Sequence, residues 1–255
     1  MKKTENKLSL EGKNIIITGG RSGLGFAMAE CIAAMGGFPV LLGSSPQEVM
    51  ETAAGRVGAG AGYHFDVTKT GEADGFVRGL AEKYGHIDGL IHSAGIHCKK
   101  PFEETTQEDF DRVFAVHVDG AIALTKAVLP IMRQQGLGSI IFISSMSAMT
   151  GMTQVTAYGA AKSAILGLVK TLTGEYAPCG IRVNAISPGF IDTPMFREAT
   201  DKDPNRQKKI LDHTPMARYG TPADVGWAAV YLCSDASRFV TGINMPVDGG
   251  FHIGF

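Results

Sequence analysis

The chain has 255 residues, a length that fits one α/β domain. Hydrophobic residues are 44% of the total, which excludes a disordered chain, and 24 Lys and Arg nearly balance 25 Asp and Glu, which argues against a nucleic-acid or membrane-surface partner. The four cysteines form no CxxC pair, so we expect neither disulfides nor structural zinc, and we expect a cytoplasmic protein. No secretory signal is recognisable, and no apolar run approaches the length of a membrane span.

Short apolar runs alternate with segments of helical periodicity from end to end. Several runs are nearly continuous Ile, Val and Leu, which is typical of strands covered on both faces. The pattern predicts a single doubly wound (Rossmann-type) parallel seven-stranded sheet with helices on both faces, in one domain that spans residues 1–255. The expected strands are 14–18, 38–43, 62–67, 89–95, 139–145, 181–187 and 242–248, and clear helical segments are 25–36 and 109–132.

The first expected strand runs into a glycine-rich turn, "TGGRSGLG", at residues 18–25. Gly19, Gly23 and Gly25 allow a tight turn and a close approach of the backbone to a pyrophosphate. The helix that follows offers free N–H groups and the positive end of its dipole. In the first βα unit of an alternating chain, this turn predicts dinucleotide binding.

Tyr158 and Lys162, in "AYGAAKSA", are four residues apart and so share one face of a helix. A nearby ammonium favours the tyrosinate, so the pair predicts a phenol that gives or takes a proton near neutral pH. Without the other motifs, the same spacing would be interpreted as an exposed Tyr and an exposed Lys. Ser145 ends the apolar run 139–145, at the carboxyl edge of the sheet where ligands bind in open α/β folds.

Residues 190–220 interrupt the alternation with a polar, proline-containing segment. A long irregular insertion in a compact domain is often functional, so we expect a substrate lid, with a plain surface excursion as the alternative.

Several stretches, in order along the chain, carry a family resemblance: "TGGRSGLG", "HFDV", "HSAG", "ISSMSA", "YGAAK", "RVNAISPGFIDTPM" and "FVTGINMPVDGG". With these motifs the chain resembles the classical short-chain dehydrogenases/reductases over essentially its whole length. The resemblance implies hydride transfer between a nicotinamide cofactor and a carbon that bears oxygen. It also implies that Ser145 hydrogen-bonds the substrate oxygen, that Tyr158 passes the proton, and that Lys162 lowers the pKa of Tyr158 and holds the nicotinamide ribose.

The resemblance further assigns the cofactor contacts. Asp66 is similar to the aspartate that meets the adenine ring, Pro188 and Gly189 to the pair beside the nicotinamide, and Thr193 to the threonine that contacts its carboxamide. The full predicted set is Gly19, Arg21, Ser22, Gly23, Leu24, Gly25, Ser44, Ser45, Asp66, Val67, Ser93, Ala94, Gly95, Tyr158, Lys162, Pro188, Gly189, Ile191 and Thr193.

The second strand ends without the acid that usually binds the ribose hydroxyls of NAD, and Ser44 and Ser45 stand in that region. Two hydroxyls would not repel a 2′-phosphate, and Arg21 could add positive charge. These features favour NADP(H) over NAD(H). An NAD site that lacks its acid is the alternative, since Arg21 is not directly before Gly23, where NADP-binding relatives often carry a basic residue.

Two positions depart from the family pattern. His92 and Ser93 replace two asparagines in "HSAG", which changes hydrogen bonds rather than function. His117 stands where the family usually has a catalytic asparagine that helps hold a relay water. Because histidine donates, accepts and titrates near neutrality, our hypothesis is that His117 substitutes in the relay with an altered pH dependence. The opposing hypothesis is a dinucleotide-binding protein with little turnover.

The substrate is the feature that the sequence indicates least. The C-terminal half is similar to gluconate 5-dehydrogenase-like enzymes and to 3-oxoacyl-carrier-protein reductases, and we predict a small polar carbonyl or secondary alcohol of the sugar-acid, ketose or polyol type, with 3-oxoacyl thioesters or ketosteroids as alternatives. His97 and Cys98 are expected to border the substrate pocket, and no metal site is expected. The resemblance implies a homotetramer or homodimer; the apolar ending "GGFHIGF" would suit burial against a neighbour or folding back on its own subunit.

Overall fold

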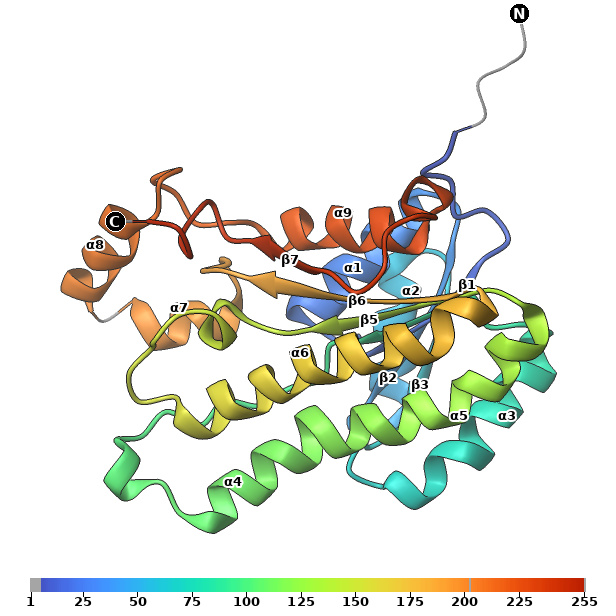
Figure 1. Cartoon of the computed structure of the whole chain (residues 1–255), viewed down its shortest axis with the longest axis horizontal. Coiled ribbons are helices and arrows are strands. Elements are labelled where there is room, and N and C mark those ends of the chain that lie inside the picture. The colour runs from blue at the N-terminus through green and yellow to red at the C-terminus, as the bar shows by residue number, and fades with distance from the viewer. Residues whose placement is uncertain (1–5, 202, 255) are drawn as a thin grey trace, which may run out of the picture.

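Seven parallel strands form one sheet in the order β3-β2-β1-β4-β5-β6-β7, as the computed structural model shows (Figure 1). The structure describes residues 6–201 and 203–254, without the side chains of residues 195, 198 and 199. This architecture confirms the predicted Rossmann-type fold. The strands are β1 Asn14–Thr18, β2 Phe38–Gly43, β3 Ala61–His64, β4 Gly89–His92, β5 Gly138–Ile143, β6 Ile181–Pro188 and β7 Asn244–Val247.

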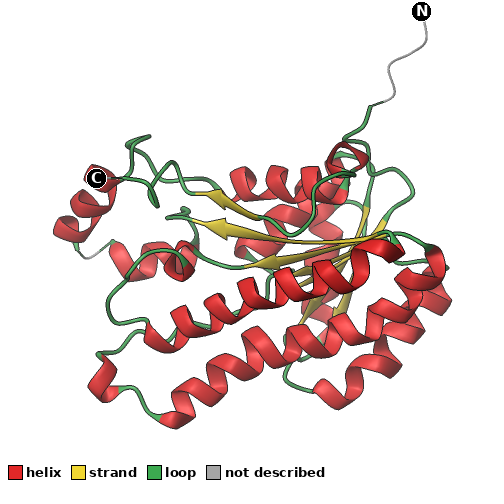
Figure 2. Cartoon of the chain, viewed as in Figure 1, coloured by secondary structure: helices red, strands yellow, loops and turns green. Residues whose placement is uncertain are grey.

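Helices cover both faces of the sheet (Figure 2). Helices α1, α2 and α9 share one apolar cluster with one face, and α3, α5 and α6 share another cluster with the opposite face. The helices are α1 Gly23–Ala34, α2 Gln47–Val57, α3 Ala73–Tyr84, α4 Gln107–Phe114, α5 Gly120–Gln135, α6 Thr156–Tyr176, α7 Pro194–Thr200, α8 Pro204–His213 and α9 Pro222–Cys233.

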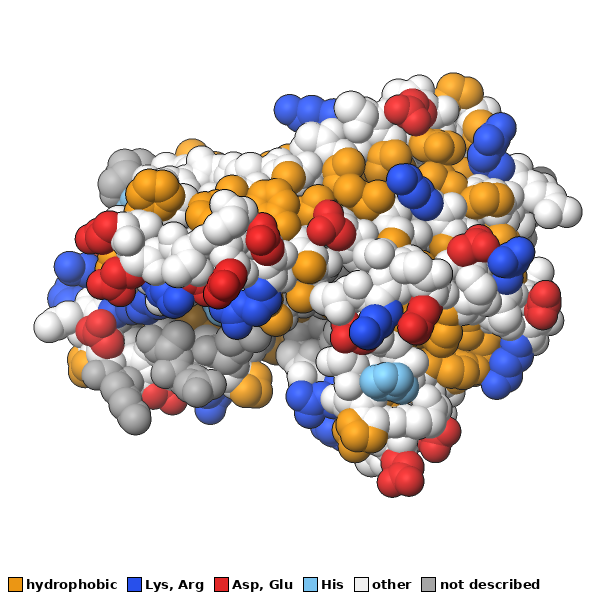
Figure 3. All heavy atoms as spheres, turned by 90° about the horizontal axis from the view of Figure 1, so that it is seen from below, with side chains coloured by type: hydrophobic (Ala, Val, Ile, Leu, Met, Phe, Trp, Pro, Cys, Tyr) orange, Lys and Arg blue, Asp and Glu red, His pale blue; other side chains and the backbone are white. Residues whose placement is uncertain are grey.

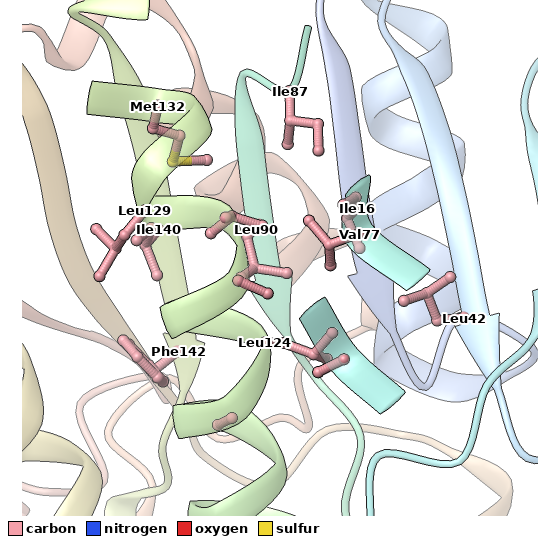
Figure 4. Packing of buried hydrophobic residues seen from close by; sticks show 14 of the residues in the cluster. Ile16, Leu42, Val77, Ile87, Leu90, Leu124, Leu129, Met132, Ile140 and Phe142 are labelled. Atoms are coloured by element: carbon pink, nitrogen blue, oxygen red, sulfur yellow. The ribbon is translucent and has the colours of Figure 1, made fainter. Parts of the chain in front are cut away.

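The core of the second cluster is built from branched aliphatic residues that point from neighbouring strands toward the same helices (Figure 4). Ile16, Leu90 and Ile140 come from adjacent strands and meet Leu124 and Val77 of α5 and α3; all five are at most 1% exposed. Burial of such side chains contributes about 1.5–3 kcal/mol each. The core therefore fixes the sheet on which the site is built.

The strand order reverses at β1, which pairs with β2 on one side and with β4 on the other. Thr18 and His92 are register neighbours at the carboxyl ends of β1 and β4. In an open α/β sheet, the crevice at such a switch point is where ligands bind.

Three sequence expectations need correction. The strands expected over 62–67, 89–95, 139–145 and 242–248 end earlier, at residues 64, 92, 143 and 247. The helix expected over 109–132 is interrupted by a π-helical turn, Ala115–Asp119. The segment 190–220 is not irregular, since it contains α7 and α8.

The helical stretch Gln107–Gln135 is long and apolar enough to cross a membrane by length and composition alone, contrary to the expectation from the sequence. Half of its most apolar window is buried inside the protein. Its apolar character therefore has an explanation within the fold, as the packing of α5 on the sheet.

Candidate active site

The glycine-rich turn has the geometry that a pyrophosphate needs. Gly19 and Gly23 have φ values of +68° and +58°, a region that favours glycine. A Cβ on Gly19 would lie 2.9 Å from the Cα of Ala94, and one on Gly25 would lie 2.4 Å from the carbonyl oxygen of Gly19. Nothing lies within 4 Å of a Cβ on Gly23, so the turn opens to space at the start of α1. Glycine is thus required at positions 19 and 25 because a Cβ would clash with the backbone, and Gly23 keeps the turn open to a ligand.

The start of α1 leaves its amide groups available. Ser22 is the N-cap, but its side chain makes no capping hydrogen bond. The first N–H groups of a helix lack partners within the helix and bear the positive end of its dipole. Arg21 and Ser22 are exposed beside this end, while Leu24 is half-buried against the core. The arrangement fits an anion.

The predicted adenosine end lies at the ends of β2 and β3. Ser44 is exposed, and the carbonyl oxygen of Ser45 lies 2.8 Å from Nδ1 of His64. The backbone N–H and hydroxyl of Thr68 donate to Asp66, and the N–H bond is the main reason that the pKa of this carboxyl is lowered. Asp66 is therefore held as an anion just past β3. Val67 next to it is buried, and its carbonyl would lie 2.6 Å from a Cβ on Gly120 of α5.

Thr18 holds the "HSAG" turn. Its buried hydroxyl accepts hydrogen bonds from the backbone N–H groups of Ser93 and Ala94, both at 3.0 Å. His92, the first departure from the family pattern, hydrogen-bonds Thr125 of α5 at 2.9 Å and stacks on Phe142. Burial, and then the charge of Lys162, lower the pKa of His92 to about 3, so it is neutral. The sequence offered no signal for Thr18 beyond its place before the glycines.

Tyr158, Lys162 and Ser145 come together at the carboxyl end of β5. The two α6 side chains share a helix face as predicted, with the Lys162 ammonium 5.5 Å from the centre of the Tyr158 ring. Lys162 donates to the carbonyl of Ile143 at 2.6 Å, which anchors the ammonium to the last residue of β5. Ser145 caps the short turn after β5, and its Oγ accepts from the N–H of Ser147 at 3.1 Å.

The acid–base balance of the pair differs from the expectation. Burial raises the pKa of Tyr158, and the hydrogen bond with Ser145 opposes that shift only in part. Burial also lowers the pKa of Lys162 to about 7. The charge of Lys162 is not among the causes of the Tyr158 shift, so the role of Lys162 in lowering the pKa of Tyr158 stays a prediction.

His117 lies in the π-helical turn and faces Tyr158 edge-on, with ring centres 5.3 Å apart. Its Nε2 lies 2.9 Å from the carbonyl oxygen and 3.1 Å from the nitrogen of Ile96, so one of these bonds forms in each tautomer. Its Nδ1 is buried and has no partner among the described residues. Gly95 leaves room for the ring, because a Cβ there would lie 2.5 Å from Cε1 of His117.

The titration that the sequence suggested for His117 is not found. Burial is the largest of the effects that lower the pKa of His117 to about 3, so the ring stays neutral near pH 7. Beside it is a cavity of about 10 Å³, lined among others by Thr18, His92, His117 and Lys162. A cavity of this size holds about one water molecule.

His97 lies directly on Tyr158. Its ring is stacked on that of Tyr158, with centres 4.8 Å apart and planes 13° from parallel, and the residue is exposed. This placement agrees with the predicted pocket border. Cys98 instead is buried in a small cluster with Val113 and Ala161, so its predicted place at the border is wrong.

The segment after β6 forms the other wall of the candidate active site. Pro188 ends β6, and Gly189 is required because a Cβ would lie 2.6 Å from the Cα of Asp248. Ile191 forms a bridge with Gly220, which closes the base of residues 190–220. Thr193 caps α7 by accepting from the N–H of Phe196 at 3.2 Å, a role that the sequence did not indicate.

An aromatic cluster joins that segment to the C-terminal tail. Phe190 packs against Phe196 and Phe251, with ring centres 5.8 and 5.0 Å apart, and Phe251 also packs against His213 of α8. The tail thus folds back on its own subunit, and Gly254 still lies against the carbonyl of His213. Ile253 is exposed, and Phe255 lies outside the described residues.

A dinucleotide fits the residues present, since the glycine cradle, the uncapped start of α1 and the polar ends of β2 and β3 lie at the carboxyl edge of one parallel sheet. Residues 19–252 match the family model described as enoyl-(acyl carrier protein) reductase. The chain is 36% identical over 251 residues to the 3-oxoacyl-(acyl-carrier-protein) reductase FabG of Thermotoga maritima, which covers 96% of this chain and 100% of that protein.

Two other similar proteins are named for different substrates. Levodione reductase of Leifsonia aquatica is 32% identical, with 92% of each chain covered. The crystal structure of a gluconate 5-dehydrogenase from Burkholderia cenocepacia, in complex with NADP and tartrate, superposes with a TM-score of 0.94 at 28% identity, covering 98% of this chain and 99% of that one. The chain therefore belongs to the short-chain dehydrogenase/reductase family, whose members are oxidoreductases that act on CH–OH groups.

Proposed function

We propose that the protein is an NAD(P)(H)-dependent oxidoreductase that interconverts a small polar carbonyl and its secondary alcohol, with Tyr158 as general acid and base. The observation that carries the proposal is the convergence of Tyr158, Lys162 and Ser145 at the end of β5, beside the glycine turn. When bound, the nicotinamide supplies or accepts the hydride.

The chain's own residues handle the proton and the oxygen. Ser145 orients the substrate oxygen toward the Tyr158 hydroxyl, and Tyr158 donates its proton in reduction and accepts it in oxidation. A phenol with a raised pKa is protonated at pH 7, which suits the reductive direction. Lys162, held by the Ile143 carbonyl, binds the ribose and restores the phenol proton.

His117 is proposed to take part in that restoration. The unpartnered Nδ1 and the one-water cavity beside Lys162 support a path in which a water joins Nδ1 to the ammonium. A neutral imidazole can accept at one nitrogen and donate at the other, so the relay does not require His117 to become charged.

NADP(H) is the proposed cofactor. The exposed Ser44 and the neighbouring Ser45 carry no negative charge to repel a 2′-phosphate, and Arg21 is exposed at the same edge. The gluconate 5-dehydrogenase named above was solved with NADP, which supports the same choice. The remaining predicted contacts, from Asp66 to Thr193, are proposed to hold the rest of the dinucleotide.

The substrate is proposed to be a sugar acid, ketose or polyol. Residues 190–220, with α7 and α8 beside the pocket wall, are proposed to form its lid. A cytoplasmic homotetramer or homodimer is the proposed state of the protein.

The test is oxidation of NADH and NADPH by the purified protein against keto-sugar acids, ketoses, acetoacetyl thioesters and ketosteroids, in single-turnover and steady-state form. We expect turnover with a polar carbonyl compound and a lower KM for NADPH than for NADH. Turnover only with thioesters or steroids would replace the proposed substrate class. Tight cofactor binding without oxidation by any compound would favour a dinucleotide-binding protein.

A further inference from the structure

The ring of Tyr158 is in contact with two histidine rings. His97 is stacked on one of its faces, with ring centres 4.8 Å apart and planes 13° from parallel. His117 meets it edge-on, with ring centres 5.3 Å apart and planes at 87°. Offset-stacked and edge-on pairs are the arrangements that aromatic rings prefer, and both stabilise the orientation of the two rings. The two histidines therefore restrict the rotation of Tyr158 about its side-chain bonds.

The loop that carries His97 is anchored on both sides of that residue. Before it, Nε2 of His117 lies 2.9 Å from the carbonyl oxygen of Ile96 and forms a hydrogen bond with the backbone there. After it, Cys98 is buried in a small cluster that includes residues of α6, the helix of Tyr158. Because both neighbours of His97 are held, its ring is fixed relative to the phenol that it covers.

The hydroxyl of Tyr158 works in one direction only. Ser145 follows the end of β5, and its hydroxyl is hydrogen-bonded to that of Tyr158. A general acid is effective when it lies within hydrogen-bonding reach of the atom that it protonates. A phenol that turned freely would spend part of its time away from Ser145. A ring held by its neighbours therefore increases the fraction of productive complexes, and with it kcat.

The same contact keeps water from the phenol. Burial is the largest cause of the raised pKa of Tyr158. Among the described residues, the titratable side chains in contact with its ring are His97, His117 and Lys162. His117 and Lys162 are buried, whereas His97 is exposed, so the His97 ring stands between the phenol and solvent. Loss of that ring should admit water and return the pKa of Tyr158 toward its ordinary value.

We infer that His97 is a positioning residue, whose stacked ring holds the phenol of Tyr158 toward Ser145 and shields it from water. The inference rests on the proposed function, in which Tyr158 passes the proton. It requires an aromatic ring at position 97 and does not require the imidazole nitrogens. In this respect His97 differs from His117, whose proposed role depends on its hydrogen bonds.

The test uses the compound of the panel above that the wild type reduces, and the corresponding alcohol. His97→Phe keeps a stacked ring and should retain kcat within about 2-fold, whereas His97→Ala should lower kcat about 2- to 10-fold, the contribution of one aromatic pair. KM for the substrate and the dissociation constant of NADPH should stay unchanged in both variants. In oxidation, where the phenolate is the base, kcat should rise at a lower pH in His97→Ala than in wild type or His97→Phe. Lys99→Ala, at an exposed position of the same loop, is the control and should change none of these quantities.

Several outcomes would overturn the inference while the proposed function stands. They are full kcat in His97→Ala, an equal loss of kcat in His97→Phe and His97→Ala, and a change of KM alone, which would make His97 a substrate contact. The wild type provides an independent measurement, because a crystal structure with NADPH bound should keep the two rings stacked. A Tyr158 ring that has moved away from His97 in that complex would also overturn the inference. Absence of turnover with every compound would instead remove the proposed function.

Discussion

At the scale of single residues, burial has changed the chemistry of the groups around Tyr158. Lys162 is 5% exposed and His117 is 5% exposed, and both have lowered pKa values because charge is costly in a poorly solvated site. Such a group exchanges protons readily near neutral pH only if its shifted pKa lies near 7, as that of Lys162 does. His117 is beyond that range and acts as a neutral polar group.

The buried ammonium should cost stability. The pKa of Lys162 falls from 10.5 to about 7 on folding, so between these values the unfolded chain binds more protons and stability rises with pH. The penalty is full below about pH 7 and is gone above about 10.5. At ~1.4 kcal/mol per pKa unit, the penalty is roughly 5 kcal/mol. A substitution that removes the ammonium also loses the hydrogen bond to Ile143, which offsets about 1–3 kcal/mol of the gain in stability.

We therefore expect Lys162→Met to abolish turnover and to raise the free energy of unfolding by about 2 kcal/mol at pH 6.5, with the gain disappearing near pH 10. Urea unfolding of wild type and variant at both pH values measures this difference in the free energy of unfolding. Lys170→Met, at an exposed position on the same helix, is the control. A variant less stable than wild type at pH 6.5 would show that Lys162 is not destabilising.

The relay role of His117 predicts a difference between two substitutions. His117→Asn keeps hydrogen-bonding groups and should retain turnover, whereas His117→Phe removes them and should lower kcat by about 100-fold, a typical contribution of proton transfer. Neither should change the dissociation constant of NADPH. Because the pKa of His117 is about 3, its removal should leave the pH–rate profile between pH 6 and 8 unchanged in shape. Full kcat in His117→Phe would exclude the relay.

At the scale of elements, sequence periodicity located the sheet well. Strands 14–18 and 38–43 match the expectation residue for residue, because short continuous aliphatic runs bounded by Gly and polar residues indicate a buried strand. The π-helical turn at 115–119 was not predicted, since the helical periodicity of the sequence continues through it. The Tyr158–Lys162 face followed from spacing alone, but the stacking of His97 on Tyr158 requires a loop path that no local pattern encodes.

The element most open to test is the proposed lid, α7 and α8, which Phe251 of the C-terminal tail contacts through Phe190 and His213. Phe251→Ala removes both ring contacts and should lower stability by about 1–3 kcal/mol. If these helices close over the substrate, KM for the substrate should rise several-fold while NADPH affinity is unchanged. Steady-state kinetics and cofactor fluorescence measure the two.

The neighbouring tail residue provides the control. Ile253 is 70% exposed, so Ile253→Ala should change neither quantity. Equal kinetics for Phe251→Ala and Ile253→Ala would argue that the tail does not position the lid.

At the scale of the whole molecule, the surface suggests association through apolar rather than charged contacts. On the face in Figure 3, acidic and basic side chains are interspersed with neutral and apolar ones. Formal net charge is −1, so long-range repulsion between copies is small. Several large apolar residues are exposed, among them Phe239 at 101% exposure and Trp227 at 50%.

We expect a tetramer or dimer in solution, measured by light scattering after size-exclusion chromatography. Phe239→Glu or Trp227→Glu should lower the mass, because a buried carboxylate in an apolar interface is costly. Phe102→Glu, at a position 66% exposed in the short 3-10 helix Phe102–Glu104, serves as the comparison. A wild-type monomer at micromolar concentration would contradict the proposal.

The contact between α1 and α9 has a consequence for how the protein is made. Gly226 of α9 lies so close to α1 that a Cβ there would be 2.5 Å from Sγ of Cys31. The side of α1 that carries Ala27 and Cys31 is therefore covered only after most of the chain has left the ribosome. The nucleotide-binding half is synthesised first but matures late, and chains halted before residue 222 would present an uncovered apolar helix to chaperones and proteases.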